Sequence, residues 1–482
     1  MSERKIDRRL FLKIMASELG LAVTSTRAGA IPESKTKPNI VFILADDMSW
    51  HQLGCYGSRF YQTPNIDRLA KQGMRFTNAY AAAPVCSPTR ASILTGKYPA
   101  RLHLTSFIPG VNATNKKLLT PQWTKHLPLE ETTLAELLKS RGYATGHFGK
   151  WHLNKDKKYQ LGRPGDPRSQ GFDDVLTTHK LGAGPESRYP NDWHHVREIT
   201  ERALAFIQNN KDKPFFCYIP HNTIHSPEKE TDQLTAKYAA KPDASSNGSC
   251  NPVQAAMIET LDNSVGTILQ KLGELNLQKN TIVVFFSDNG HLGPKNGLPF
   301  RGSKGDLYEG GIRMPLIVRW PQLVRPATIC DEVVISNDFF PTFAELAGAS
   351  RMPADLDGIS LMPLLKNHKA GLNRTALYWH FPHYHGQGLA PSGAIRRGKY
   401  KLLEWFEPSI YDEKGALELY DLDNDPAERN NLAGSMPDLA SDLYRWLRTW
   451  RKQIGAQLMT ANPDYHPNTQ TKDKQHQQEP RP

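Results

Sequence analysis

The chain contains 482 residues, of which 39% are apolar and 23% are charged, and it carries a formal net charge of +11. This length exceeds what one compact domain usually holds, so we expect two domains. The positive charge favours an anionic partner, but the sequence lacks the dense Lys/Arg runs and aromatic-interleaved basic stripes of nucleic-acid-binding proteins. No segment has the uninterrupted apolar length of a membrane span, so neither a nucleic acid partner nor a membrane span is expected.

The first 30 residues have the features of an export signal. The run Asp7-Arg8-Arg9-Leu10-Phe11-Leu12-Lys13 resembles a twin-arginine signal, and a modest apolar stretch follows it. Ala28-Gly29-Ala30 is a plausible small-residue cleavage site. A solvated N-terminal helix is the alternative. We therefore predict an export signal at residues 1–30, a mature chain that begins near Ile31, and a periplasmic or secreted product.

Strand-like and helical segments alternate over the next 340 residues or so. Residues 39–44, 281–286 and 314–318 are short apolar runs of strand length, as in buried parallel strands. Helical spacing or helix-start signals mark residues 64–72, 196–209, 255–275 and 337–346. This alternation predicts an α/β fold with a large mixed, mostly parallel sheet between two layers of helices, in a domain of residues 31–372.

The pattern changes after residue 373. Short runs at 400–403 and 417–420 are separated by turn residues, and residues 436–453 are helical. A smaller C-terminal subdomain with an antiparallel sheet and a helix is therefore expected at residues 373–462. Residues 463–482, rich in Gln, Lys, Asp and Pro, are expected to be a disordered tail.

Acidic and amide side chains follow two of the apolar runs. Asp46 and Asp47 come after the first run, and Asp288 and Asn289 come after the run at 281–286. Ligands of open α/β sheets bind at the carboxyl ends of the strands, so these four side chains are expected to converge. Their oxygen atoms suit Ca²⁺, or less well Mg²⁺, and suit Zn²⁺ poorly. Turns or helix caps are the alternative for each pair alone.

The most informative segment contains Cys86, Pro88 and Arg90, followed by Thr95 and Gly96. It resembles the C-x-P-x-R signature of the type I sulfatases, members of the alkaline phosphatase superfamily, whose cysteine is converted to formylglycine by a formylglycine-generating enzyme. A buried cysteine near a helix start is one alternative. A thiolate phosphatase is another, but its Arg should lie six residues after the Cys, where this chain has Ser92.

The resemblance implies a nucleophile that Cys86 itself does not supply. A hydrated formylglycine carries two hydroxyls, of which one attacks sulfur and the other later expels sulfate. A helix expected to begin near Ala91 would point backbone N–H groups at the anion, and Arg90 would brace the diol. With Cys86 consumed, Cys55, Cys217, Cys250 and Cys330 remain, and their pairing cannot be deduced from the sequence.

Three further segments match the family in order along the chain. Lys150 and His152 lie in the first, His225 in the second and Lys304 in the third. The resemblance implies that both lysines clamp sulfate, that His152 assists sulfate expulsion and that His225, with an ordinary pKa near 6.5, protonates the leaving alcohol. Each residue alone would more often be a surface lysine or a structural histidine.

The family resemblance also assigns the cation site. Asp46, Asp47, Asp288 and Asn289 would hold the cation against the group derived from Cys86, and Asp288 would also accept a proton from the diol.

Substrate selection is expected from a segment near the domain junction. Trp379, His380, His383 and His385 lie on what looks like a loop, and aromatic and imidazole groups suit sugars. A packed interdomain loop and a zinc site are the alternatives. Residues 192–195, Asp-Trp-His-His, are a weaker candidate for the same rim.

The resulting hypothesis is a Ca²⁺-dependent, formylglycine-using sulfatase that cleaves sulfate esters of a carbohydrate. The net positive charge is in keeping with a sulfated polymer as substrate. Two alternatives remain: a phosphonate monoester or phosphodiester hydrolase with the same nucleophile, and an exported carbohydrate-binding homologue without activity.

Overall fold

The structure is a computed structural model that describes residues 37–111, 113–154, 162–245, 249–293, 299–386 and 389–467. The predicted export signal and residues 468–482 of the predicted tail lie outside the described residues. Within the described part of the chain, no helix combines the length and the apolar character needed to cross a membrane.

The strands fall into a large sheet, a smaller sheet and one short pair. They are β1 (Asn39–Ala45), β2 (Met74–Tyr80), β3 (Leu118–Leu119), β4 (Ala144–Lys150), β5 (Asp174–Thr178), β6 (Phe215–Pro220), β7 (Thr281–Ser287), β8 (Arg313–Arg319), β9 (Thr328–Cys330), β10 (Val334–Ile335), β11 (Leu377–Phe381), β12 (Ser392–Arg397), β13 (Tyr400–Trp405), β14 (Leu417–Asp421) and β15 (Thr460–Ala461).

The helices lie mostly between the strands of the large sheet. They are α1 (Pro64–Lys71), α2 (Cys86–Thr95), α3 (Leu134–Ser140), α4 (Val196–Asn209), α5 (Asp232–Ala239), α6 (Pro252–Glu274), α7 (Glu309–Ile312), α8 (Phe339–Leu346), α9 (Met362–Lys366), α10 (Phe406–Ile410) and α11 (Pro437–Gln453), with short 3₁₀ helices at Trp50–Gln52, Gly54–Tyr56, Pro167–Gln170 and Ser336–Asp338.

The large sheet has nine strands in the order β10-β2-β8-β7-β1-β6-β4-β5, with β9 also paired to β2. The central strands β7, β1, β6, β4 and β5 run parallel, whereas β8 runs antiparallel to β7 and to β2. The predicted mixed, mostly parallel sheet is therefore confirmed, and the carboxyl ends of five adjacent strands share one edge.

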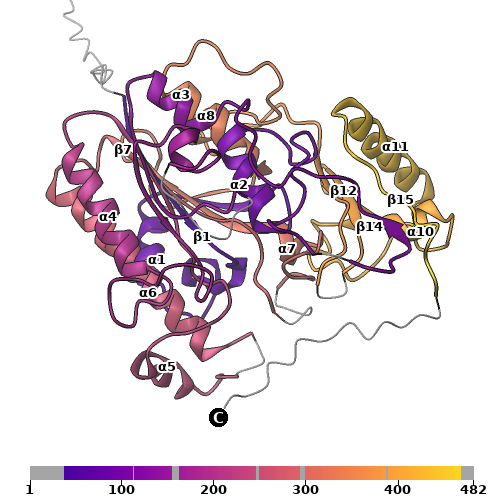
Figure 1. Cartoon of the computed structure of the whole chain (residues 1–482), viewed down its shortest axis with the longest axis horizontal. Coiled ribbons are helices and arrows are strands. Elements are labelled where there is room, and N and C mark those ends of the chain that lie inside the picture. The colour runs from indigo at the N-terminus through magenta and orange to yellow at the C-terminus, as the bar shows by residue number, and fades with distance from the viewer. Residues whose placement is uncertain are drawn as a thin grey trace, which may run out of the picture. The chain divides into compact units, whose positions relative to one another are not determined.

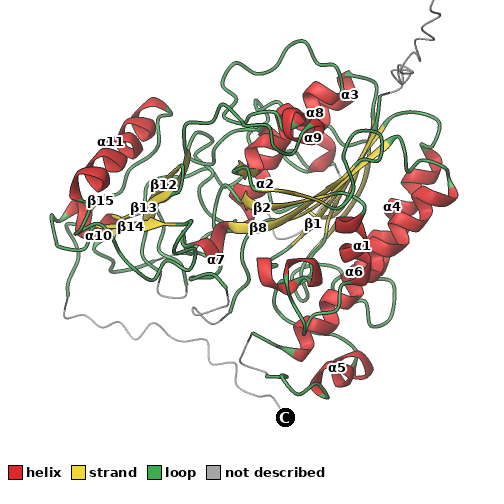
Figure 2. Ribbon diagram, turned by 180° about the vertical axis from the view of Figure 1, so that it is seen from behind, coloured by secondary structure: helices red, strands yellow, loops and turns green. Residues whose placement is uncertain are grey.

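Helices cover both faces of this sheet, because its central strands are apolar on both sides (Figure 1). Alternate residues of β1 point to opposite faces. Ile40, Phe42 and Leu44 join a core with helices α2, α3, α8 and α9, while Val41 and Ile43 join a core with α1, α4 and α6. Both layers of helices appear in Figure 2.

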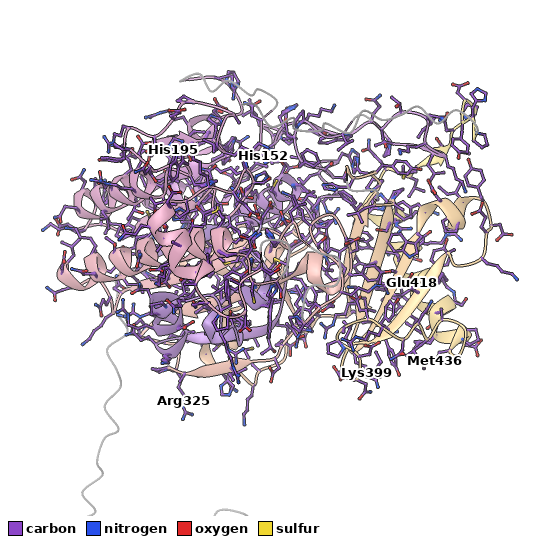
Figure 3. The ribbon with its side chains drawn as sticks, turned by 90° about the horizontal axis from the view of Figure 1, so that it is seen from below. His152, His195, Arg325, Lys399, Glu418 and Met436 are labelled. Atoms are coloured by element: carbon purple, nitrogen blue, oxygen red, sulfur yellow. The ribbon has the colours of Figure 1, made fainter. Side chains whose placement is uncertain are left out.

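The smaller sheet is antiparallel, in the order β11-β12-β13-β14, and α11 packs against it. It confirms the predicted antiparallel sheet and helix of the C-terminal part. In Figure 3, Lys399, Glu418 and Met436 lie on this side, and His152 and His195 lie on the side of the large sheet. The first strand of the smaller sheet, β11, covers Leu377–Phe381, so the expectation of a loop around residue 379 is wrong.

Candidate active site

Three carboxylates meet at the carboxyl edge of the large sheet. Strands β1 and β7 pair in parallel along their full length, so Asp46 and Asp47 emerge beside Asp288 and Asn289. One carboxylate oxygen from each Asp lies within 4.8 Å of the others, and all three residues are buried. The convergence expected for these four side chains is therefore present. Gly290 allows the turn that follows, since a Cβ there would lie 2.0 Å from the carbonyl oxygen of Gly310.

The donor set fits a hard cation. Oδ1 of Asp46 and Oδ1 of Asn289 are buried and accept no hydrogen bond from any described residue. Burial raises the pKa of Asp288 well above its usual range, and the neighbouring charge of Asp46 raises it further. Three buried carboxylates repel one another, so a divalent cation held by oxygen ligands would relieve this repulsion.

Cys86 is the first residue of α2, five residues earlier than the predicted start near Ala91. That expectation is wrong because Pro88 lies within the first helical turn, where its missing N–H needs no partner. Every residue of α2 is buried. The side chain of residue 86 consequently lies at the N-terminal end of a buried helix, where the helix dipole favours negative charge.

Arg90 links three parts of the site. Its Nε donates to Oδ2 of Asp288 over 2.9 Å, and its Nη1 donates to the carbonyl oxygen of Lys150 over 2.8 Å. Its Nη2 lies 2.8 Å from the same Asp288 oxygen and 3.8 Å from Oδ1 of Asp46. The side chain is 1% exposed. Arg90 therefore holds α2 against the ends of β4 and β7.

Two buried lysines contact the carboxylates. Nζ of Lys150, at the end of β4, lies 2.6 Å from Oδ2 of Asp46. Nζ of Lys304 lies 2.7 Å from each oxygen of Asp47. Burial alone would raise the pKa of Asp46, but the charges of Lys150, His225 and Arg90 outweigh this effect and hold it well below its usual value. Both lysines thus lie in the predicted site.

His152 contacts the side chain of residue 86. Its Nε2 donates to the carbonyl oxygen of Ile108 over 2.6 Å, and its Nδ1 lies 3.1 Å from Sγ of Cys86. Burial lowers the pKa of His152 well below its usual value, and the charge of Lys150 lowers it further. The imidazole is therefore neutral, with Nδ1 free to accept a proton from residue 86.

His225 lies at the other side of the cluster. Its Nδ1 donates to the carbonyl oxygen of Ser226 over 2.5 Å, and its Nε2 lies 3.8 Å from Oδ2 of Asp47. Burial lowers its pKa to about 4, although Asp47 opposes this shift. The expectation of an ordinary pKa near 6.5 is therefore wrong, because the side chain is largely removed from water.

Two of the four residues expected to bind substrate are structural. Trp379 is 1% exposed, and its Nε1 donates to the carbonyl oxygen of Ala81 over 2.8 Å. His380 is also buried, and its Nε2 donates to the carbonyl oxygen of Gln457 over 2.8 Å. Both lie on β11, where neighbouring side chains point to opposite faces of the small sheet. Trp379 packs into the core of that sheet and His380 against the Phe406 ring, so neither is available to a substrate.

The other two lie closer to the reaction centre. His383 is buried, with Nε2 at 2.7 Å from Oγ1 of Thr105. His385 is partly exposed, and the charge of Lys304 adds to burial in lowering its pKa to about 4. Among the described His, Cys, Asp and Glu side chains, only the three-Asp cluster has metal-site spacing, so the zinc alternative is wrong.

The weaker candidate at residues 192–195 caps α4. Asp192 accepts hydrogen bonds from Ser187 and from two backbone N–H groups of the helix. His194 is buried, and burial together with His225 lowers its pKa to about 4. The ring of Trp193 lies 4.6 Å from Nζ of Lys229. This segment therefore borders the site on the side of His225.

His291 is a site residue that the sequence reasoning did not assign. Its Nδ1 donates to the carbonyl oxygen of Asp47 over 3.2 Å, and its Nε2 accepts from Nε2 of Gln254 over 2.8 Å. Its carbonyl oxygen accepts the backbone N–H of Lys304 over 3.0 Å. The sequence feature that could have identified His291 is its position two residues after Asn289. His291 connects the cation site to the second lysine.

Family models match most of this chain. The model described as Sulfatase matches residues 38–349, and the model described as N-sulphoglucosamine sulphohydrolase, C-terminal, matches residues 303–453. The first match contains the residues of the site described above except Trp379, His380, His383 and His385.

Individual proteins match over nearly the full length. A sulfatase from Formosa agariphila is 30% identical, with 92% of this chain and 94% of that protein covered. Human arylsulfatase A is 32% identical, with 85% and 86% covered. An N-acetylgalactosamine-6-O-sulfatase from Bacteroides thetaiotaomicron is 29% identical, with 86% and 94% covered.

A solved structure also superposes well. The crystal structure of Ps i-CgsB in complex with k-i-k-neocarrahexaose has a TM-score of 0.71 and 27% sequence identity, with 86% of this chain and 93% of that chain covered.

Proposed function

Since this chain belongs to the sulfatase family, within the alkaline phosphatase superfamily, and is a sulfuric ester hydrolase, we propose that residue 86 supplies its nucleophile after conversion to formylglycine. When formed and hydrated, formylglycine supplies a hydroxyl that attacks sulfur. The observation that carries this proposal is the position of Cys86, at the N-terminal end of α2 beside three carboxylates and two lysines. Maturation would require a formylglycine-generating enzyme.

The cation is proposed to be Ca²⁺, held by Asp46, Asp47, Asp288, Asn289 and the group derived from Cys86. A bound divalent cation withdraws charge from oxygen atoms near it. Arg90 anchors Asp288 in the required orientation through two contacts. Asp288 is also proposed to accept a proton from the nucleophile.

The remaining polar residues are proposed to handle the sulfate and the leaving group. Lys150 and Lys304 compete with a cation for the same carboxylates, so both become available to clamp sulfate oxygens when the cation binds. The negative charge of a sulfate ester raises the pKa of His225, which then protonates the leaving alcohol. His152, neutral and facing residue 86 through Nδ1, assists sulfate expulsion by accepting a proton.

The substrate is proposed to be a sulfated carbohydrate. Support comes from relatives that are named for sulfated N-acetylgalactosamine and from a similar structure in complex with an oligosaccharide. The twin-arginine-like run supports export to the periplasm or beyond. N-terminal sequencing of exported protein should then find a start near Ile31.

Mass spectrometry of the peptide that contains residue 86, combined with a sulfate-release screen on defined saccharides, tests the proposal. The protein is made in a host with a formylglycine-generating enzyme, as wild type and as Cys86→Ala. The wild-type peptide should show the aldehyde mass and release sulfate, and the variant should be inactive. Equal sulfate release by the Cys86→Ala variant would overturn the nucleophile assignment. Phosphodiesters assayed in parallel distinguish the alternative hydrolase, and a verified aldehyde without any turnover would favour a binding homologue.

A further inference from the structure

A group of aromatic and basic side chains lies near Ile108, whose carbonyl oxygen accepts the hydrogen bond of His152. We name it the aromatic wall and define it by Phe107, Trp123, Lys125, His383 and His385. The backbone N–H of Ile108 donates to Oγ of Ser87 over 3.1 Å, and its carbonyl oxygen accepts from His152. Phe107, the first member of the wall, therefore precedes the residue that holds His152, and His152 in turn contacts residue 86.

Ring contacts join the members of the wall into two groups, one of Trp123, Lys125 and His383 and one of Phe107 and His385, and the segment 383–385 carries a member of each. The Trp123 ring packs on Gly110, where a Cβ would lie 2.6 Å from it, and meets the His383 ring edge-on at 5.4 Å. Nζ of Lys125 lies 5.2 Å from the Trp123 ring centroid. The Phe107 and His385 rings lie 5.7 Å apart. Four members are partly exposed, and His383, behind them, is buried.

His385 connects the wall to the second lysine of the site. A Cβ on Gly305, the residue after Lys304, would lie 3.0 Å from Nδ1 of His385. This nitrogen is buried and has no hydrogen-bond partner among the described residues. The wall consequently extends from the contact of His152 to the segment that carries Lys304, along one border of the reaction centre.

The charge of this region has one sign. Residues 68–129 contain nine Lys and Arg residues and no Asp or Glu. Several of these cations have carboxylate partners elsewhere, as Lys97 and Arg101 do with Asp355 and Asp357. Lys125 has no ion pair with any described residue. Burial, together with the charge of Lys125, lowers the pKa of His383 to about 3. An unpaired ammonium over an indole ring suits a sugar that carries an anionic group.

We propose that the aromatic wall is a specificity site for a second anionic group, a carboxylate or a sulfate, on the sugar next to the one that is desulfated. This inference rests on the proposed function. Trp123 offers a face to the neighbouring sugar ring, and Lys125 binds its anionic group. Neutral neighbours would lose the contact with Lys125, so the wall selects polyanionic glycans over substrates with a single sulfate.

The test uses the preferred substrate from the saccharide screen, its carboxyl-reduced form, its form without the second sulfate, and 4-methylumbelliferyl sulfate. Lys125→Gln should lower the ratio of kcat/KM for the preferred substrate to kcat/KM for the aryl sulfate by about fivefold, mainly through KM. Lys125→Arg should restore most of the ratio. Lys279→Gln is the matched control, because Lys279 is exposed and precedes β7, at the opposite edge of the sheet.

The two modified saccharides identify which anion binds. Loss of the Lys125 effect on carboxyl reduction assigns a carboxylate, and its loss on removal of the second sulfate assigns a sulfate. Three results would overturn the inference while leaving the sulfatase assignment intact. They are a preferred substrate with no second anionic group, an unchanged kcat/KM ratio in Lys125→Gln, and an equal change of that ratio in Lys279→Gln. Inactivity of the wild type on every sulfate ester would instead refute the proposed function.

Discussion

Replacement of Arg90 separates its role in the reaction from its role in stability. Arg90→Ala leaves Asp288 buried without its guanidinium partner, and the broken pair also releases the carbonyl oxygen of Lys150. Breaking a buried pair in this way costs about 3–5 kcal/mol in the free energy of unfolding. At roughly 2 cal/mol/K per residue over the described chain, this corresponds to a decrease in Tm of about 4–6 °C.

A second buried pair supplies the control. Nη2 of Arg374 lies 2.6 and 2.7 Å from the two oxygens of Asp338, and both side chains are nearly as buried as Arg90 and Asp288. Arg374→Ala should therefore lower Tm by a similar amount. Only Arg90→Ala should lower kcat, by about 100-fold or more, because displacement of reacting groups by about 1 Å has that effect.

The assay is hydrolysis of 4-methylumbelliferyl sulfate at a temperature at which both variants are folded, with Tm from differential scanning fluorimetry. Arg90→Lys keeps the charge but can replace only some of the guanidinium contacts, so its kcat should lie between those of Arg90→Ala and the wild type. A kcat for Arg90→Ala within about threefold of the wild-type value would contradict the positioning role of Arg90. An equal loss of activity per folded molecule in Arg374→Ala would contradict it as well.

Metal removal, a buried charge cluster and acid titration give three further predictions. Exhaustive EDTA treatment should abolish activity and lower Tm, and Ca²⁺ should restore both better than Mg²⁺. Full activity in protein that elemental analysis shows to be metal-free would contradict the cation site. Lys401→Met should lower the free energy of unfolding, measured by urea denaturation, by about 3–5 kcal/mol. The reason is that Nζ of Lys401 lies 2.9 Å from the carboxylates of both Glu309 and Glu428 in a fully buried cluster. A loss below about 1 kcal/mol would contradict this prediction. Burial lowers the pKa of four histidines to about 3, so the unfolded chain binds more protons than the folded chain between pH 6.5 and pH 3, and stability should fall as the pH falls through this window. The loss at pH 5 is about 2 kcal/mol per histidine at most, and an unchanged Tm between pH 7 and pH 5 would rule this out. These histidines are His147, His221, His380 and His383.

The sequence alone determined the class of fold and most of the candidate site. Apolar runs that end abruptly in acids predicted the convergence of Asp46, Asp47, Asp288 and Asn289, because parallel neighbours must present their carboxyl ends at one edge. The helix at 255–275, observed as α6, followed from apolar residues at helical spacing, which the burial of one helix face requires.

Other features depended on tertiary contacts that no local pattern reports. Trp379 and His380 have the side chains of a sugar-binding loop, but pairing with β12 places them in a buried strand. The pKa of His225 depends on burial by distant segments, so its residue type alone predicted the wrong value. Trp123 packs on Gly110, and Ile108 of the same segment bonds to Ser87 of α2 and to His152, so only tertiary packing brings this part of the chain to the site. Local sequence sets the elements and the ends of strands, whereas burial, charge and neighbours at the rim arise from segments far apart in the chain.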